Sequence, residues 1–348
     1  MKIAAFLPNW IGDVVMATPA LRALRRHFAG ARLIGVGKPY VLGVLDGCDW
    51  FDQLLPAHGG TWSQGIASTA WKLRAEGIDL AVLFPNTLRS ALTAWFGSAR
   101  RTIGYRRYGR APFLTDALEP RRTPEGRLEI SPVVDAYNRL AMQAGCPEPG
   151  YQLELFTTPQ DNQAAQQVWE MGRLGDYPEV VCLNSGAAFG ASKHWPTDYF
   201  AELARNLVAR RGCALLVLCG PAEKAQAAEI VRLANLPQVV SLGELSERGG
   251  PRLSLGLTKA CVQRADLLVT TDSGPRHFAH AFNRPVVTLF GPTHIAWTET
   301  YHPRAIHLQK QVECGPCQKR VCPLDHCCMK LLTPREVQQA VELLLQGS

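Results

Sequence analysis

Short apolar runs alternate with helical patterns along almost the whole chain. In the first half, the expected strands are residues 2–7, 32–36, 51–55 and 79–84, and the expected helices are 14–28, 62–76 and 88–96. In the second half, the expected strands are 180–184, 214–219, 238–241, 266–270 and 285–290, and the expected helices are 199–211, 222–234 and 255–264. Nearly continuous apolar strands separated by helices are typical of parallel sheets covered by helices on both faces. The sequence therefore predicts an α/β fold.

Two such sheets are expected, because 348 residues exceed what one core usually holds. Proline and glycine in residues 146–150 disfavour regular structure there. We therefore expect two doubly wound, Rossmann-like domains over residues 1–158 and 159–332, and a terminal helix over 333–348. In folds of this kind, ligands bind beyond the carboxyl ends of the strands. The cleft between the two domains is the expected site.

Composition limits the class of protein. A hydrophobic content of 47% and a charged content of 19% indicate an ordered globular protein. No apolar run is long enough to span a bilayer. The first apolar run stops at Pro8 without the features of a signal peptide, so we expect a first strand and a cytoplasmic protein.

The net charge of +7 favours anionic partners such as nucleotides or phosphorylated lipids. The positive charge is concentrated between Arg100 and Arg127, where Arg106 and Arg107 lie between two tyrosines. Helix-turn-helix, RRM and zinc-finger patterns are not found, so we expect no nucleic-acid partner. A basic surface facing an anionic substrate or a membrane is the preferred interpretation, and a general contribution to solubility is the alternative.

Polar turns follow several of the expected strands. After the first strand, Gly12 and Asp13 open a helix, in which Asp13 is either a cap or a general base. In the second half, a loop of small residues ends at Lys193 and resembles a phosphate loop in composition. His194 stands where a Walker loop would have the magnesium-binding Ser or Thr, which favours a phosphate site without a metal ligand. An ordinary surface lysine is the alternative.

Two further turns point to the same kind of ligand. Glu223 follows Gly220-Pro221 in the first turn of a helix, where it either complements the helix dipole or binds a ribose or base. Residues 270–277 join a strand to a helix whose free N–H groups could seat a phosphate. Asp272 or Ser273 could cap that helix, and Gly274 allows close approach of a ligand. Together these turns predict a nucleotide or nucleotide-sugar pocket in the second half.

These segments together resemble the bacterial lipopolysaccharide heptosyltransferases, glycosyltransferase family 9, which have the GT-B fold. The resemblance covers most of the chain and rests on a combination of motifs: Asn9–Asp13, Met16–Leu21, Ser192–Pro196, Asp272–His277 and Leu289–Thr293. Within the family, the opening motif and the cysteine-rich tail are more similar to the second heptosyltransferase of inner-core synthesis than to the first. The resemblance also implies that the terminal helix packs back toward the N-terminal domain.

The resemblance implies an inverting transfer of L-glycero-D-manno-heptose from ADP-heptose to the first heptose of the lipopolysaccharide inner core. Asp13 would deprotonate the acceptor hydroxyl, and Lys193 would neutralise charge on the ADP leaving group. The implied donor-binding residues are Ser185, Gly186, Lys193, Glu223, Asp272, Ser273, Gly274 and His277. No cofactor is expected to be required for catalysis, and no metal is expected at the site.

The implied acceptor is an anionic lipid at the cytoplasmic face of the inner membrane, with which the protein would associate peripherally. Charge density alone assigns Arg106 and Arg107 to this acceptor. Two alternatives stay open: a family-9 enzyme with another nucleotide-sugar donor, and a non-catalytic protein that binds a nucleotide sugar. The presence of both Asp13 and Lys193 argues against the second.

Five cysteines lie close together near the C-terminus: Cys314, Cys317, Cys322, Cys327 and Cys328. The Cys-x-x-Cys spacing resembles a zinc or iron–sulfur site, so a structural metal is one interpretation. Disulfides are not the default in a cytosolic protein. Free buried thiols and an adventitious disulfide are the other two interpretations.

Overall fold

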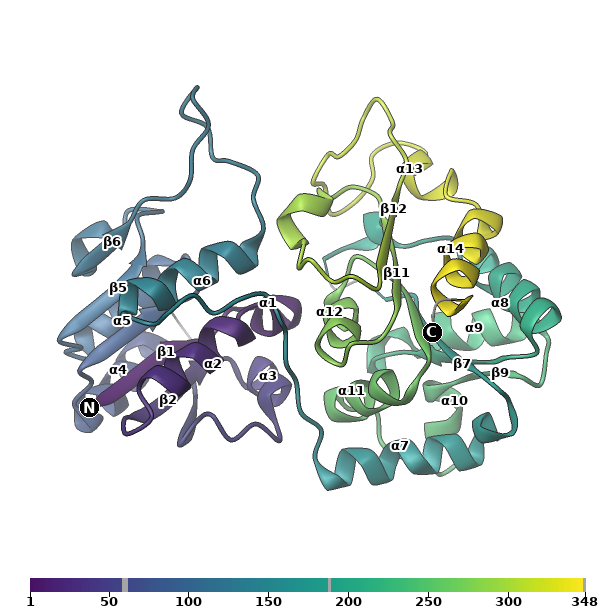
Figure 1. Cartoon of the computed structure of the whole chain (residues 1–348), viewed down its shortest axis with the longest axis horizontal. Coiled ribbons are helices and arrows are strands. Elements are labelled where there is room, and N and C mark those ends of the chain that lie inside the picture. The colour runs from purple at the N-terminus through teal and green to yellow at the C-terminus, as the bar shows by residue number, and fades with distance from the viewer. Residues whose placement is uncertain (58–61, 187–188, 347–348) are drawn as a thin grey trace. The chain divides into compact units, whose positions relative to one another are not determined.

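The computed structural model describes residues 1–57, 62–186 and 189–346, which form two compact units (Figure 1). The first unit runs from Met1 to Phe156 and includes Ala296–Thr300. The second unit runs from Thr157 to Ile295 and continues from Tyr301. The predicted fold of two parallel sheets covered by helices is confirmed, and it corresponds to the GT-B fold.

The sheet of the first unit has the strand order β3-β2-β1-β4-β5-β6, with every neighbouring pair parallel. Its strands are β1 (Lys2–Phe6), β2 (Arg32–Gly37), β3 (Gln53–Pro56), β4 (Leu80–Leu83), β5 (Arg101–Tyr105) and β6 (Asp116–Leu118). Its longer helices are α2 (Thr18–His27), α4 (Trp62–Glu76), α5 (Leu88–Phe96) and α6 (Val133–Ala144). Helix α2 packs against α6, and α4 packs against α5. This arrangement places the carboxyl ends of β1 and β4 side by side, where polar loops begin.

The sheet of the second unit has the order β12-β11-β10-β7-β8-β9 and is also parallel throughout. Its strands are β7 (Val180–Asn184), β8 (Ala214–Leu218), β9 (Val239–Ser241), β10 (Leu267–Thr271), β11 (Val286–Phe290) and β12 (Ala305–Gln309). From β7 the chain first adds strands on one side, and from β10 onward it adds them on the other side. Right-handed crossovers in both directions place helices on both faces of the sheet. The carboxyl ends of β7 and β10 therefore lie together at the position where such sheets bind ligands.

The helices of the second unit cover both faces of its sheet (Figure 1). They are α7 (Pro159–Met171), α8 (Thr197–Arg211), α9 (Lys224–Ala234), α10 (Leu242–Glu247), α11 (Leu255–Arg264), α12 (Gly274–Ala281), α13 (Cys327–Lys330) and α14 (Pro334–Gln346). The terminal helix α14 packs against α8 and against β10, β11 and β12, within the second unit. Its packing toward the N-terminal domain stays a prediction.

The helix expected over residues 14–28 is in fact two helices, which join at Ala17. Helix α1 (Ile11–Met16) begins three residues earlier than expected, and α2 follows it at once. Pro19 explains the break, because proline is tolerated in the first turn of a helix but not in its interior. The hydroxyl of Thr18 donates to the carbonyl of Val15 at 2.7 Å and closes the junction. The early start of α1 places Asp13 in its first turn.

Three strands, β5, β6 and β12, were not expected from the sequence. β5 begins with an arginine and contains Gly104, and β12 is half-buried along its whole length. Neither has the continuous apolar run that predicts a central strand. Within the part of the chain that the structure describes, no helix has the length and apolar character needed to cross a membrane.

Arg110 belongs to the basic stretch of the first unit but is fully buried. Its guanidinium donates to the Tyr105 carbonyl at 2.8 Å and to the Asn86 side chain at 2.9 Å, and it also bonds the Pro85 carbonyl. Burial, and then the charge of Arg107, lower the pKa of Arg110 to about 10. Arg110 therefore fastens the loop after β5 to the loop after β4 and adds no charge to the surface.

We expect Arg110→Leu to lower the free energy of unfolding by about 3 kcal/mol, because it leaves several buried acceptors without a donor. Arg100 is 82% exposed in its side chain and pairs with Asp79, so Arg100→Leu is a matched control with an expected change within about 0.5 kcal/mol. Urea denaturation measures both. Equal destabilisation by the two variants would contradict the role of Arg110.

Candidate functional site

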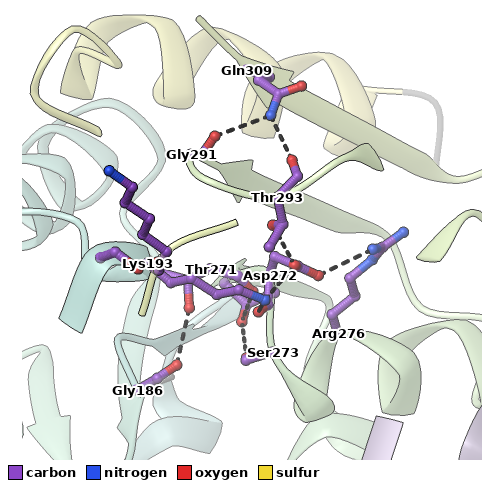
Figure 2. A network of polar contacts seen from close by, with 12 residues as sticks. Gly186, Lys193, Thr271, Asp272, Ser273, Arg276, Gly291, Thr293 and Gln309 are labelled. Carbon is purple, nitrogen blue, oxygen red and sulfur yellow. Dashed lines mark hydrogen bonds and ion pairs between the residues drawn. The ribbon is translucent and has the colours of Figure 1, made fainter. Parts of the chain in front are cut away.

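Lys193 and Asp272 form a buried ion pair at the carboxyl ends of two adjacent strands (Figure 2). Lys193 ends a short 3-10 turn (Ala191–Lys193) in the loop that follows β7, and Asp272 directly follows β10. The ammonium Nζ lies 2.5 Å from the carboxylate Oδ2 and donates to the Asp272 carbonyl at 2.9 Å. Lys193 is only 8% exposed and Asp272 only 6%. The surface-lysine alternative is therefore wrong.

A second cation shares the carboxylate of Asp272. Arg276, on α12, is 0% exposed, and its Nη1 lies 3.5 Å from Asp272 Oδ1. Its guanidinium also lies over the ring of Phe290, 5.0 Å from the ring centre, and its Nη2 lies 3.2 Å from His307 Nε2. One carboxylate thus contacts two buried cations beside the start of α12. Buried cations grouped at a helix start favour an anionic ligand.

Thr293 completes the environment of Asp272 (Figure 2). Its hydroxyl donates to Asp272 Oδ2 at 2.7 Å, and its backbone carbonyl accepts from Gln309 Nε2 at 2.8 Å. Gln309 also donates to the Gly291 carbonyl at 3.2 Å, which fixes the loop after β11. The sequence analysis did not assign a role to Arg276, Thr293 or Gln309. The Gly-Pro-Thr turn after the 285–290 strand was the available signal for Thr293.

These contacts together lower the pKa of Asp272. Burial alone would raise it, but the charges of Lys193 and Arg276, with hydrogen bonds from Lys193 and Thr293, hold the pKa below 3.8. Asp272 is therefore an ionised carboxylate whose oxygens are already engaged. It is suited to orienting Lys193 and unsuited to accepting a proton from a substrate.

The start of the loop after β7 packs closely against Glu223 and β10. Ser185 is buried, and its hydroxyl has no hydrogen-bond partner among the described residues. The carbonyl of Gly186 accepts from the Thr271 hydroxyl at 2.9 Å. A Cβ at Gly186 would lie 2.0 Å from Glu223 Oε1, so a larger residue here would displace the Glu223 carboxylate. Glu223 Oε2 in turn accepts from the Gly220 N–H at 2.8 Å, which matches the helix-start alternative.

Helix α12 begins beside the ion pair, and its first residues are partly exposed. Ser273 occupies the N-cap position, but its hydroxyl accepts from Asn184 Nδ2 at 2.9 Å and caps no helix N–H. Asp272 does not cap the helix either, because its carboxylate is held by Lys193. The helix start at Gly274 therefore keeps its positive end open to a ligand.

His277 is buried inside the unit, at 3% exposure. Burial, and then the charge of Arg276, hold the pKa of His277 well below 6.5. The imidazole is therefore uncharged at neutral pH and cannot supply a cation to a phosphate. Its ring makes an edge contact with the ring of His280, with the centres 5.8 Å apart.

In the first unit, Asp13 lies in the first turn of α1, beyond the carboxyl end of β1. The N-cap is Trp10, and no side chain caps this helix, so the cap alternative for Asp13 is wrong. The carboxylate is partly exposed and lies near α6, where burial first and the charge of Asp13 second raise the pKa of Tyr137 well above 10. Asp13 thus has the placement, at a strand end, that a base requires.

The basic stretch exposes less free charge than the sequence suggests. Arg106 pairs with Glu119 at 3.0 Å on the surface, and Arg101 pairs with Asp116 at 3.0 Å. The guanidinium of Arg107 lies over the ring of Tyr108, 4.9 Å from its centre. Surface ion pairs in water are weak, so Arg106 can exchange Glu119 for an anionic ligand.

The five cysteines near the C-terminus lie within one cluster of thiols. The side chains of Cys314 and Cys327 are hydrogen-bonded to each other. Burial, followed by the neighbouring thiols, raises the pKa of Cys328 to about 11. Among the described residues, no three His, Cys, Asp or Glu side chains form a group that could hold a metal ion. All eleven cysteines are free thiols. A structural metal stays a prediction, which metal analysis of protein purified under reducing conditions tests.

The comparison with known proteins identifies relatives along the whole chain. The family model described as "Glycosyltransferase family 9 (heptosyltransferase)" matches residues 66–328. Lipooligosaccharide heptosyltransferase 2 of Campylobacter jejuni is 25% identical over 100% of this chain and 99% of its own length. Lipopolysaccharide heptosyltransferase 2 of Escherichia coli is 27% identical over 84% of this chain and 83% of its own length.

Solved structures with the same fold include two that cover this chain entirely. A family 9 glycosyltransferase from Veillonella parvula has a TM-score of 0.83 at 23% identity, with 97% of its chain covered. The E. coli ADP-heptose LPS heptosyltransferase II has a TM-score of 0.78 at 24% identity, with 99% of its chain covered. The predicted resemblance to the second heptosyltransferase of inner-core synthesis is confirmed.

We expect Asp272→Asn to lower the free energy of unfolding by about 3–5 kcal/mol at pH 7, because two buried cations lose their carboxylate. The folded-state pKa of Asp272 lies below 3.8, so its stabilisation is complete above pH 3.8 and is lost as pH falls through the folded pKa. The difference between variant and wild type should therefore shrink in acid. Urea denaturation at several pH values measures it.

Asp198 is exposed in the first turn of α8, so Asp198→Asn serves as the matched control, with an expected change of about 0.5 kcal/mol or less. A difference between Asp272→Asn and wild type that stays constant from pH 7 to pH 3 would refute the ionised state of Asp272.

Proposed function

The chain belongs to glycosyltransferase family 9, the heptosyltransferases, and from this premise we propose a donor, an acceptor and a mechanism. The protein is a heptosyltransferase of lipopolysaccharide biosynthesis. The proposed reaction transfers L-glycero-D-manno-heptose from ADP-heptose to the first heptose of the inner core, with inversion at the anomeric carbon. Among the similar structures, the E. coli protein is described as an ADP-heptose heptosyltransferase. Another donor of the same class is the alternative.

The observation that carries this proposal is the pair of buried cations at the carboxyl ends of β7 and β10. Lys193 and Arg276 share one carboxylate there, and the start of α12 lies beside them. Departure of ADP leaves negative charge on a diphosphate, and such charge is stabilised by fixed cations and N–H dipoles. Asp272 holds Lys193 in place before the ligand arrives, which lowers the cost of reorganisation during the reaction.

The other predicted donor-binding residues surround this charge. Ser185 offers a buried hydroxyl, and Gly274, at the start of α12, is a position where a ligand can approach the backbone. Gly186 is proposed to hold Glu223 at the edge of the site. Glu223 packs against Gly186 and is proposed to contact the adenosine. His277, being buried and uncharged, is proposed to shape the interior wall behind the site.

Asp13 is the proposed general base. An inverting displacement needs one base, which removes the proton of the attacking hydroxyl on the side opposite the leaving group. Asp13 is a partly exposed carboxylate at the carboxyl end of β1, in a unit separate from the one that carries Lys193. Asp13 lies in the first turn of α1, where the helix dipole favours an acidic side chain.

The proposed acceptor is the anionic, lipid-linked inner core. Arg106 and Arg107 are proposed to bind its phosphates, because both carry charge at the exposed end of β5. Peripheral association with the inner membrane is also proposed. Trp95 and Phe96, which are 53% and 50% exposed at the end of α5, are the kind of side chain that lies at a membrane surface.

We expect Asp13→Asn to lower kcat for heptose transfer by roughly 10²–10⁴-fold, because the amide cannot accept the proton. ADP affinity should stay at the wild-type value, since the proposed role of Asp13 is toward the acceptor hydroxyl and not toward the ADP diphosphate. A steady-state assay with ADP-heptose and calorimetry with ADP measure the two quantities. Full turnover by the variant would exclude Asp13 as the base, and lack of transfer with several nucleotide sugars would favour a non-catalytic protein.

We expect Arg106→Ala together with Arg107→Ala to raise the acceptor KM about tenfold at low salt, with kcat nearly unchanged. The increase should diminish at high salt, because exposed charges are screened. Arg232 is exposed on α9 of the other unit and pairs with Glu229, so Arg232→Ala is the control. A KM that does not respond to the double substitution or to salt would remove these arginines from the acceptor site.

A further inference from the structure

The cysteine-rich segment, residues 314–328, contacts the loop that carries Lys193. Ser192, the residue before Lys193, is held there by three hydrogen bonds. Its N–H donates to the Arg320 carbonyl at 3.1 Å, and its hydroxyl donates to the Lys319 carbonyl at 2.5 Å. His326 Nε2 lies 2.6 Å from the Ser192 carbonyl. A carbonyl can only accept, so the imidazole donates this bond through Nε2–H.

Close packing reinforces these hydrogen bonds. A Cβ at Gly190 would lie 2.3 Å from the Arg320 carbonyl oxygen, so a larger residue would push the segment away. Gly190 also has φ of 156° and ψ of 167°, a conformation that is nearly restricted to glycine. The backbone at Gly190 therefore fits the cysteine-rich segment only because no side chain is present.

The same segment contacts the loop that carries Thr293. The N–H of Gln318 donates to the Pro292 carbonyl at 2.8 Å. A Cβ at Gly291 would lie 2.5 Å from Met329 Sδ and 3.2 Å from Cys328 Sγ. The two loops that hold the partners of Asp272, one with Lys193 and one with Thr293, are thus joined through this part of the chain.

We propose that the cysteine-rich segment positions Lys193, with His326 and Ser192 as the positioning residues. The proposal rests on the proposed role of Lys193 toward the ADP diphosphate. A lysine ammonium ends a flexible four-carbon stem, so its location depends on a fixed backbone as well as on its partner. Ser192 is only 2% exposed. Hydrogen bonds made by its N–H, hydroxyl and carbonyl hold the peptide that leads into Lys193, and they thereby fix the position of the Lys193 Cα. A displacement of about 1 Å at a catalytic group can cost a hundredfold in rate.

The proposed positioning role of the cysteine-rich segment does not require a bound metal ion. The segment has little regular structure of its own apart from the four-residue helix α13. The loop of Lys193 lies beside this segment at Ser192. Because of the hydrogen bonds of Ser192, the position of the Lys193 ammonium depends on the position of the cysteine-rich segment.

The test is a double-mutant cycle in the full chain, with ADP affinity and kcat as readouts. We expect His326→Ala to weaken ADP binding and lower kcat by roughly tenfold, because Lys193 becomes less well placed. In a Lys193→Met background the same substitution should have no further effect, since residues that act as a unit are non-additive. His326→Gln keeps an N–H donor and should recover most of the loss. Ser192→Ala should resemble His326→Ala in direction.

Val321→Ala is the matched control, because Val321 lies in the same segment and is 70% exposed. Thermal unfolding checks that every variant is folded. Equal effects of His326→Ala in both backgrounds, or an equal effect of Val321→Ala, would overturn the positioning role while leaving the proposed function intact. Wild-type ADP binding and turnover by Lys193→Met alone would instead overturn the proposed role of Lys193.

Discussion

The buried carboxylate of Asp272 is the interaction on which the second unit depends. It lies between Lys193 and Arg276, each brought in from a different segment, and neither cation would be stable at that depth without it. Removal of a charge from water is costly, and the mutual attraction of an ion pair offsets this cost only when the geometry is good and the remaining polar atoms are satisfied. The hydrogen bond from Thr293 and the ring of Phe290 beneath Arg276 contribute to that condition.

The topology of the sheet explains how these groups meet. β7 and β10 are neighbours in space although more than eighty residues of sequence separate them, because the chain reverses its direction of crossover there. Ser185 directly follows β7 and Asp272 directly follows β10, so both residues lie at the same edge of the sheet. Both loops start from strands that are buried along their whole length, because helices cover both faces of a parallel sheet. The cysteine-rich segment then fixes the far end of the Lys193 loop through Ser192.

The sequence predicted the fold well where the apolar runs were continuous. The central strands β7, β8, β10 and β11 were expected within one or two residues, because both of their faces are buried. The edge strands β6 and β12 and the inner strand β5 were missed, since strands that contain charged or exposed residues have a mixed composition. The break before α2 was missed because Pro19 was interpreted as tolerable near the start of one long helix, whereas it lies in the first turn of a second helix.

The location of the site was predictable from the sequence, but the pairing of its charged groups was less so. Polar turns after buried strands indicated Lys193, Asp272 and Glu223, but no local pattern shows which groups pair after folding. For Lys193, a surface position was the alternative to a phosphate site, whereas its partner lies 79 residues away. Arg276 and Gln309 were not recognised, because a basic residue in a helix and an amide in a strand are usually solvated. The burial of Arg276 and the partial burial of Gln309 arise only when the sheet assembles.

The same arrangement couples the stability of this unit to the proposed ligand. Buried cations are costly unless nearby charges and hydrogen bonds offset their loss of water, and apolar side chains in their place often leave a fold equally stable. This chain instead keeps Lys193 and Arg276 on Asp272, next to the start of α12. A diphosphate bound there, as proposed, would add negative charge beside these cations and would stabilise the folded unit by linkage. The close packing around Asp272 is what holds the buried cations in place before a ligand binds.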